Sequence, residues 1–240
     1  MIDEGYGDYI AWKGWSNIRF GSIVSDNAAY FSSEIAASGL RSLAGLQVLE
    51  LGFGNGQFGA WAQSKGACYS GTERLPALLE EAEANGWRVA PSSCDLTAFS
   101  PPSGVDLVAA FDVFEHFDLE QLESTLLAIR DILKPTGLLI ARVPSGDSPF
   151  ARANQHGDLT HLISLGSMAV YQLAHSAGFE VVRVKEPAFP LLGLGLTVFF
   201  RRLTVFSLRW CFFKFVSTVL MGNGNAILTP NLVFILRRSA

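Results

Sequence analysis

The chain has 240 residues, 49% of them hydrophobic, which is enough to bury one sizeable core as a single α/β domain. Its three cysteines, Cys68, Cys94 and Cys211, are widely spaced and form no CxxC pair, which argues against a disulfide framework and a cysteine zinc site. The opening MIDEGYGDYIAWKGW lacks the basic and apolar regions of a secretory signal. These features predict a protein of the reducing cytoplasm.

The net charge of −4 is unevenly distributed along the chain. Residues 1–188 hold all 22 acidic residues, whereas 189–240 contain basic residues and no acidic one. This basic tail is also rich in aromatic residues, and its uncharged runs are too short or too interrupted for a membrane-spanning helix. The tail is therefore expected to form a surface different from that of the acidic part.

The arrangement of apolar runs predicts a doubly wound α/β domain. One or two helices are expected within 8–40, ahead of the first strand. Strands are then expected at 47–51, 68–73, 87–93, 105–112, 137–144, 180–186 and 231–238, with helices at 56–66, 75–86, 119–133 and 165–179. This alternation indicates right-handed crossovers and a parallel sheet covered on both faces.

The expected organisation is a helical cap at 1–45, a ligand-binding core at 46–188 and a basic aromatic helical elaboration with a last strand at 189–240. We expect all three to form one domain.

A glycine-rich loop, in VLELGFGNGQFG, follows the first strand at Gly52, Gly54 and Gly56. In doubly wound sheets this turn meets the ligand with its backbone. A dinucleotide fingerprint would need a third glycine at 57, where the chain has Gln57. Glu50, two residues ahead of the loop, would repel a pyrophosphate but favour a ligand with an ammonium and a sulfonium, which points to S-adenosylmethionine. The alternative is a tight turn without a ligand.

Two further acids end the next two strands. Glu73 ends the second strand, where a carboxylate can accept hydrogen bonds from both hydroxyls of a ribose. Asp95 follows the third strand, where it can accept from an adenine amine beside the backbone of Leu96. Asp95 is alternatively only the N-cap of a helix that begins at Leu96.

The ordered segments VLELGFGNG, GTE, CDLT, DLVAAFDVFEHF and LKPTGLLIARVP resemble the motifs of class I S-adenosylmethionine-dependent methyltransferases, over roughly residues 46–185. The resemblance implies a seven-stranded Rossmann-like sheet whose last strand is antiparallel. The acid that ends the second strand is usually Asp, so Glu73 departs from the pattern. The cofactor roles that the resemblance implies fall on Glu50, Gly52, Gly54, Gly56, Glu73, Asp95 and Phe111.

Methyl transfer to a hydroxyl needs a base, and two segments offer one. In FDVFEHF, His116 follows the fourth strand, although helix capping and cofactor positioning explain this segment equally well. Some methyltransferases resemble it with E-x-x-E-H and use that motif, with a further His, to bind a divalent cation. Here Asp112, Glu115 and His116, with His156 or His161, are the corresponding candidates, and Asp112 departs from the motif.

The second segment is the polar loop after the fifth strand, which contains Asp158 and His161. Asp158 paired with His161 would orient an imidazole suited to deprotonating a sugar or phenol hydroxyl. The alternative is that Asp158 and Thr160 cap the next helix while His161 packs beneath the loop. His175, inside a predicted helix, is expected to be structural.

The basic aromatic stretch 191–221 suits the interface of an anionic membrane, or a groove for a lipid-linked substrate. A helical lid packed on the domain and an oligomer contact are the alternatives. From GDLTHLISLGSM to ILTPNLVFILRR, the chain is similar to methyltransferases associated with bacterial surface-polysaccharide and O-antigen biosynthesis. That similarity implies O-methylation of a sugar hydroxyl on a glycan or lipid-linked glycan, at the cytoplasmic face of the inner membrane.

Two other functions remain open at this stage. One is methylation of a quinone or lipid-like phenol, and another is a non-catalytic cofactor-binding scaffold. A nucleic-acid acceptor is not expected, because the predicted catalytic part is acidic and no N/D-P-P-Y motif is present.

Overall fold

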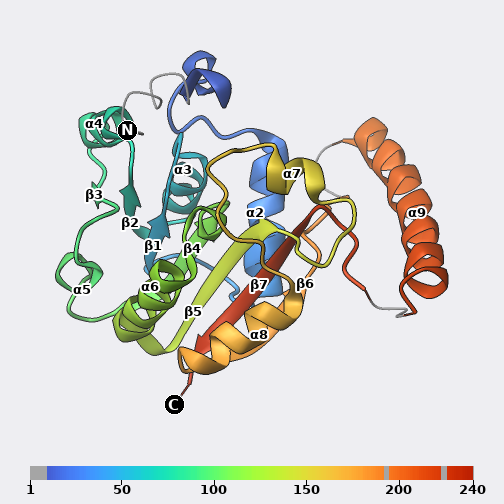
Figure 1. The fold of residues 1–240 in the computed structure, drawn as a ribbon. Coiled ribbons are helices and arrows are strands. Elements are labelled where there is room, and N and C mark those ends of the chain that lie inside the picture. The colour runs from blue at the N-terminus through green and yellow to red at the C-terminus, as the bar shows by residue number, and fades with distance from the viewer. Residues whose placement is uncertain (1–9, 192–194, 223–225, 240) are drawn as a thin grey trace.

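The computed structural model describes residues 10–191, 195–222 and 226–239. These residues contain a seven-stranded sheet with helices on both faces, in the strand order β3-β2-β1-β4-β5-β7-β6 (Figure 1). Strands β1 to β5 pair in parallel, and β7 pairs antiparallel with both β5 and β6. The strands are β1 (Gln47–Leu51), β2 (Cys68–Glu73), β3 (Val89–Pro91), β4 (Val105–Phe111), β5 (Leu133–Pro144), β6 (Phe179–Lys185) and β7 (Asn231–Arg238).

Helices fill the connections between these strands and precede the first of them. The α-helices are α2 (Ser25–Ala37), α3 (Gln57–Ser64), α4 (Pro76–Ala84), α5 (Leu96–Phe99), α6 (Leu119–Ile132), α7 (Arg152–His156), α8 (Ser167–Ser176) and α9 (Leu196–Val219). The 3-10 helices are η2 (Trp15–Asn17) and η3 (Phe114–His116).

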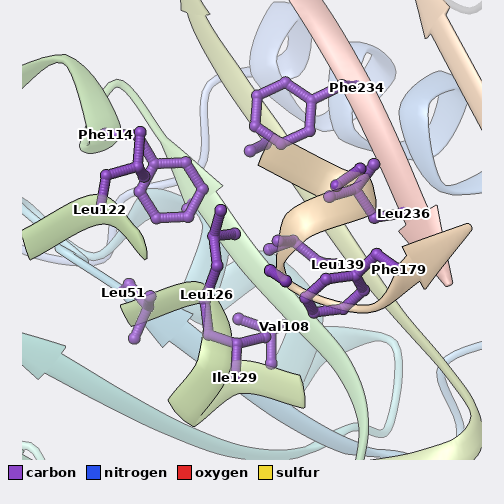
Figure 2. Close-up of a cluster of buried hydrophobic side chains, with 14 of the residues drawn as sticks. Leu51, Val108, Phe114, Leu122, Leu126, Ile129, Leu139, Phe179, Phe234 and Leu236 are labelled. Carbon is purple, nitrogen blue, oxygen red and sulfur yellow. The ribbon is translucent and has the colours of Figure 1, made fainter. Parts of the chain in front are cut away.

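The central strands are apolar on both faces because helices cover each side. On one face, Leu126 and Ile129 of α6 pack against Val108 of β4 and Leu139 of β5, as Figure 2 shows. On the other face, aromatic side chains of α2 and α3, including Phe31, pack against strands β1 and β4. This burial on both sides is the pattern expected of parallel strands joined by helical crossovers.

The predicted fold class is confirmed, including the antiparallel last strand. The main difference lies in β5, which begins at Leu133 rather than at 137, because Leu133 pairs with Val105 ahead of an irregularity in the ladder. The structure assigns α2 and η2 to the predicted N-terminal cap, whose residues 1–9 lie outside the described part. The predicted tail helix is present as α9, and residues 192–194 of that stretch also lie outside it.

Helix α9 stands beyond the β6 edge of the sheet, in the connection between β6 and β7 (Figure 1). Within the described ranges, no helix is both long enough and apolar enough to span a membrane.

The parallel strands position the candidate site. Strands β1, β2, β4 and β5 are neighbours that end at the same edge of the sheet, so the segments that follow them gather there. This edge is where ligands bind in doubly wound sheets.

Candidate active site

The glycine loop between β1 and α3 has a left-handed backbone at all three glycines. The φ angles of Gly52, Gly54 and Gly56 are 62°, 54° and 76°. A Cβ at Gly56 would lie 2.7 Å from the ring of Phe20 and 2.8 Å from that of Trp87. Glycine is therefore required both for the turn and for the aromatic side chains that pack against it.

Glu73, at the end of β2, is buried and bound to backbone amides. The amide of Gly54 donates to its Oε2 at 2.8 Å, while the amides of Arg74 and Leu75 donate to its Oε1 at 2.6 and 3.1 Å. Each carboxylate oxygen can accept more than one hydrogen bond, so Glu73 retains acceptor capacity for ribose hydroxyls. The structure thus shows a hydrogen bond between the predicted glycine loop and Glu73, the residue predicted to bind the ribose.

Asn55, within the loop, is a polar residue that the sequence analysis did not single out. Its amide nitrogen Nδ2 is buried and has no hydrogen-bond partner among the described atoms. An unsatisfied donor beside left-handed backbone suits an anionic group such as an amino-acid carboxylate. Together with Glu73, this donor fits S-adenosylmethionine, which has a carboxylate and two ribose hydroxyls. The only feature of the sequence that could have indicated Asn55 is its position between two glycines of the loop.

Glu50 is held inside the protein rather than at the surface of the loop. Its side chain is buried, and the hydroxyl of Tyr69 donates to its Oε2 at 2.6 Å. Burial raises the pKa of Glu50 well above its usual value. The ionised form assumed in the sequence analysis is therefore disfavoured in this structure, and a cation bound nearby would restore it.

Asp95 caps helix α5. Its side chain accepts a hydrogen bond from the amide of Thr97 at 2.8 Å, so the capping contact that was the alternative to an adenine role is present. Asp95 is exposed and Leu96 is half-buried, at the end of β3. The adenine role of both residues stays a prediction.

Phe111, the last residue of β4, packs in an aromatic group with Tyr30, Phe31 and Phe58, with ring centroids 5.2 to 6.1 Å apart. Asp112, which follows it, has a φ of 59° and is paired with the guanidinium of Arg142 on β5. The Nε of Arg142 donates to its Oδ1 at 2.9 Å. This pair joins the ends of β4 and β5 and engages both carboxylate oxygens of Asp112.

A second group of polar side chains lies after β4 and β5. His116, the last residue of η3, has its Nδ1 2.9 Å from the Oγ1 of Thr160, and that hydroxyl donates to the Oδ1 of Asp158 at 2.6 Å. Since the single hydroxyl proton goes to Asp158, Nδ1 of His116 must be the donor to Thr160. The neutral ring then has its lone pair on Nε2.

Burial is the main reason why His116 is neutral. Burial and the neighbouring His161 lower the pKa of His116 below its ordinary 6.5. Burial alone would raise the pKa of Asp158, but hydrogen bonds from Thr160 and the charge of Lys13 lower it to about 2. Near neutral pH the group therefore contains an ionised carboxylate and a neutral imidazole.

His161 lies beside His116, with ring centroids 4.7 Å apart. Its Nδ1 donates to the backbone oxygen of Gln155 at 3.0 Å, and its Nε2 is 4.0 Å from Asp158 Oδ2 and 3.9 Å from Glu115 Oε1. The structure therefore brings His161 and Asp158 close together, but it places the hydrogen-bonded link to Asp158 on His116.

The ligating atoms of Glu115, His116 and His161 lie within 4.8 Å of one another, close enough for one metal ion. Glu115 is buried, and burial raises its pKa to about 8, with a further contribution from Asp112. His156, an alternative ligand from the sequence, is exposed on α7 and is not in this group. His175 is exposed on the surface of α8, which is compatible with the structural role expected from the sequence.

The N-terminal segment contacts both parts of this edge. A Cβ at Gly54 would lie 3.0 Å from the ring of Trp15, so this tryptophan covers the glycine loop. Two residues earlier, Lys13 Nζ is 3.3 Å from Asp158 Oδ2. Sequence analysis missed Lys13, because no local pattern pairs it with a residue so distant in the chain.

Comparisons with known proteins agree with this geometry. Residues 48–137 match a family model described as a methyltransferase domain. A search of curated protein sequences finds no match.

Solved structures resemble the whole fold at low sequence identity. An S-adenosylmethionine-dependent methyltransferase from Archaeoglobus fulgidus is 18% identical, with a TM-score of 0.62 over 88% of this chain and 94% of that one. One from Mesorhizobium loti is 16% identical, with a TM-score of 0.59 over 90% of this chain and 100% of that one.

A Burkholderia thailandensis 1,6-didemethyltoxoflavin-N1-methyltransferase with bound S-adenosylhomocysteine is 15% identical, with a TM-score of 0.55 over 98% of this chain and 87% of that one. The family match runs from β1 to the start of β5 and includes the glycine loop and Glu73. Residues 48–137 therefore match a methyltransferase domain, and the chain has the fold of these S-adenosylmethionine-dependent methyltransferases.

Proposed function

We propose that this chain methylates a sugar hydroxyl on a glycan or lipid-linked glycan, with His116 as the general base. The observation that carries the proposal is the chain of hydrogen bonds from Asp158 through Thr160 to His116. It fixes the tautomer in which Nε2 of His116 is the basic atom. Because β4 is the neighbour of β1 in the sheet, this base lies one strand away from the glycine loop.

S-adenosylmethionine, when bound, supplies an electrophilic methyl group on a sulfonium that is already a good leaving group. The protein then has to align the acceptor oxygen and remove its proton. As the oxygen–carbon bond forms, the hydroxyl proton passes to Nε2 of His116, and the imidazolium later returns it to water. The ionised Asp158 stabilises that imidazolium through Thr160, as a carboxylate does for a catalytic histidine.

The surroundings of His116 favour a polyhydroxylated acceptor over an apolar quinol. Lys13, Asp158, Thr160 and Glu115 place charged and hydroxyl groups around the imidazole. These groups form a polar surrounding that suits the hydroxyl groups of a sugar better than the apolar ring of a quinol. On this proposal the reaction takes place in the cytoplasm, where a membrane-linked acceptor would face the enzyme.

The direct test is an assay of the purified protein with S-adenosylmethionine and two sets of acceptors. Sugars and lipid-linked glycans form one set, and quinols and other lipid-like phenols form the other. We expect S-adenosylhomocysteine release and an oxygen-linked methyl group, located by mass spectrometry, only with the first set. Methylation of the quinols alone would contradict the choice of acceptor. Donor binding without turnover on either set would instead indicate a cofactor-binding scaffold.

A chelator distinguishes the imidazole base from a metal centre at the same residues. With His116 as the base, dialysis against EDTA leaves the rate unchanged. If EDTA abolished activity and Mg²⁺ restored it, Glu115, His116 and His161 would be assigned as ligands, and His116 would be excluded as the base.

Comparing surface glycans of cells with and without the gene by mass spectrometry would identify the natural acceptor.

A further inference from the structure

Helix α9 has apolar side chains that the rest of the protein does not cover. Over its 24 residues the buried side chains are those of Val216 and Ser217. Leu208 is 67% exposed, and Phe200 and Phe215 are each 61% exposed. A surface helix of a soluble domain ordinarily turns polar side chains to water. This helix exposes large apolar side chains as well as polar ones.

The side of α9 that faces the domain holds two of the helix's four cations, Arg202 and Arg209. Arg202 donates to the backbone oxygen of Pro190 at 2.7 Å and to Asp26 of α2 at 2.6 Å. Arg209 lies over the rings of Phe189 and Phe213. These positions lie with Val216 on one side of a helix that has 3.6 residues per turn. Phe200 lies opposite these positions, and Leu208 and Phe215 lie about 100 to 120° away from them around the helix.

The packing between α9 and the domain is incomplete. A cavity of about 490 Å³ separates the helix from the end of β6 and the residues that follow it, with Lys185, Phe206, Trp210 and Phe213 among its lining residues. A tightly packed lid would bury its apolar side chains in such a space, since protein interiors leave few voids of this size. The structure therefore gives little support to a lid.

The charges on α9 indicate which kind of surface its outer face would bind. The helix contains no acidic residue, and Arg201 and Lys214 are exposed at the borders of the apolar outer face. Long cationic side chains can extend from a helix at the membrane interface to lipid phosphates while their aliphatic parts stay in apolar surroundings. Apolar side chains with flanking cations are typical of helices that lie in the plane of an anionic bilayer.

We propose that α9 lays its outer face, formed by Phe200, Leu208 and Phe215, on an anionic lipid bilayer. The inference does not depend on which acceptor the enzyme uses. Phe150, in the segment after β5, lies 5.8 Å from Phe212 and 6.0 Å from Phe213 between ring centroids. That segment continues to Asp158 and Thr160, so a bilayer under α9 would lie beside the acceptor side of the site.

Co-sedimentation of the full chain with vesicles tests the proposal. Phosphatidylcholine vesicles are compared with vesicles that also contain phosphatidylglycerol, at low and at high salt. We expect binding to the anionic vesicles, little binding to the neutral ones, and weaker binding at high salt. Replacing both Arg201 and Lys214 by Ala should weaken binding to anionic vesicles about thirtyfold at low salt, since each cation near the surface contributes about 1 kcal/mol.

A pair of matched double variants separates the outer face from a general effect of added charge. Leu208→Glu with Phe215→Glu places two carboxylates on the outer face of α9 and should abolish binding. Leu127→Glu with Tyr171→Glu places two carboxylates at exposed positions of α6 and α8 and should leave binding unchanged. Thermal unfolding and S-adenosylhomocysteine affinity should be the same for both variants, which checks that each is folded.

Two outcomes would overturn the proposal. One is equal sedimentation of the wild-type chain with neutral and anionic vesicles, unaffected by either α9 substitution. The other is absence of vesicle binding together with a dimer, seen by sedimentation velocity, that the Leu208→Glu/Phe215→Glu variant converts to a monomer. The outer face would then be the contact between two copies of the chain.

Discussion

The proposed donor side of the sheet edge, formed by the glycine loop and Glu73, and the proposed acceptor side, formed by His116, Asp158 and Thr160, are built in different ways. On the donor side, Glu73 is held by backbone amides from its own turn and from the adjacent glycine loop. On the acceptor side, His116 depends on the side chain of Thr160, 44 residues later in the chain, and Asp158 depends on Lys13 from the N-terminal segment. The first arrangement follows from local turns, whereas the second requires the fold to bring distant segments together.

This difference suggests that the two sides can be disturbed separately. Changes on the acceptor side should reduce the rate without changing donor affinity. Changes in the glycine loop should reduce stability and donor affinity together.

The largest effect is expected for His116→Ala. Loss of a general base typically lowers the rate by about 100- to 10,000-fold, and no other group in the proposal accepts the proton. Steady-state kinetics should show the loss in kcat, while calorimetry should show unchanged affinity for S-adenosylhomocysteine. His175→Ala, on the exposed face of α8, is the control and should retain full activity. A His116→Ala enzyme with near-normal kcat would remove the imidazole from the mechanism.

Gly56→Ala should have the next largest effect, on the donor side. Its methyl group would meet Phe20 and Trp87 at less than 3 Å, on a backbone with a φ of 76°. We expect a loss of about 2–4 kcal/mol in the free energy of unfolding, measured in urea. Gly86→Ala has a similar φ of 75° with no atom within 4 Å of the added Cβ, so it isolates the backbone strain at about 1–2 kcal/mol. Equal losses at both positions would show that the aromatic packing is unimportant.

Thr160→Val keeps the size of the side chain and removes the hydroxyl between His116 and Asp158. We expect kcat to fall by about tenfold or more, as for other groups that orient a functional imidazole, with donor affinity unchanged. Thr160→Ser retains the hydroxyl and should restore most of the rate. If the Ser and Val variants were equally slow, the hydroxyl would not be the positioning group.

The pH dependence of the rate gives the smallest predicted change near neutral pH. The base must be neutral, and burial together with His161 lowers the pKa of His116. Activity should therefore be full at pH 7 and should fall only as the pH decreases below 6.5 and the imidazole becomes protonated. A fall in kcat centred above pH 6.5 would indicate a different titrating group.

Much of the donor side could be predicted from the sequence because its signals are contiguous. Strands β1, β2 and β7 begin and end at the predicted residues, since short apolar runs bounded by glycine, acidic or basic residues leave little freedom. The turn at Gly52 to Gly56 needs positive φ, which glycine reveals directly. The ionisation of Glu50 was not predictable, because it depends on Tyr69, a residue of the neighbouring strand, and on complete burial.

The acceptor side could be predicted only as a set of residue types. The sequence indicated His116, His161 and Asp158, but it paired Asp158 with His161, three residues later in the chain. The actual link runs through Thr160 to His116, because the loop after β5 folds back so that the amide of Leu162 donates to the backbone oxygen of Glu115 at 2.8 Å. The path of a loop is set by such long-range contacts, which leave no periodic pattern in the sequence.

The position of β7 has a consequence for how the protein is made. β7 lies inside the sheet between β5 and β6, yet it follows α9 in the chain. During synthesis, α9 therefore leaves the ribosome before the strand that completes the sheet exists. For that interval the nascent chain exposes both the apolar side chains of α9 and the unpaired edges of β5 and β6, which makes it prone to aggregation. An early encounter of α9 with a chaperone or a lipid surface would shorten that exposure.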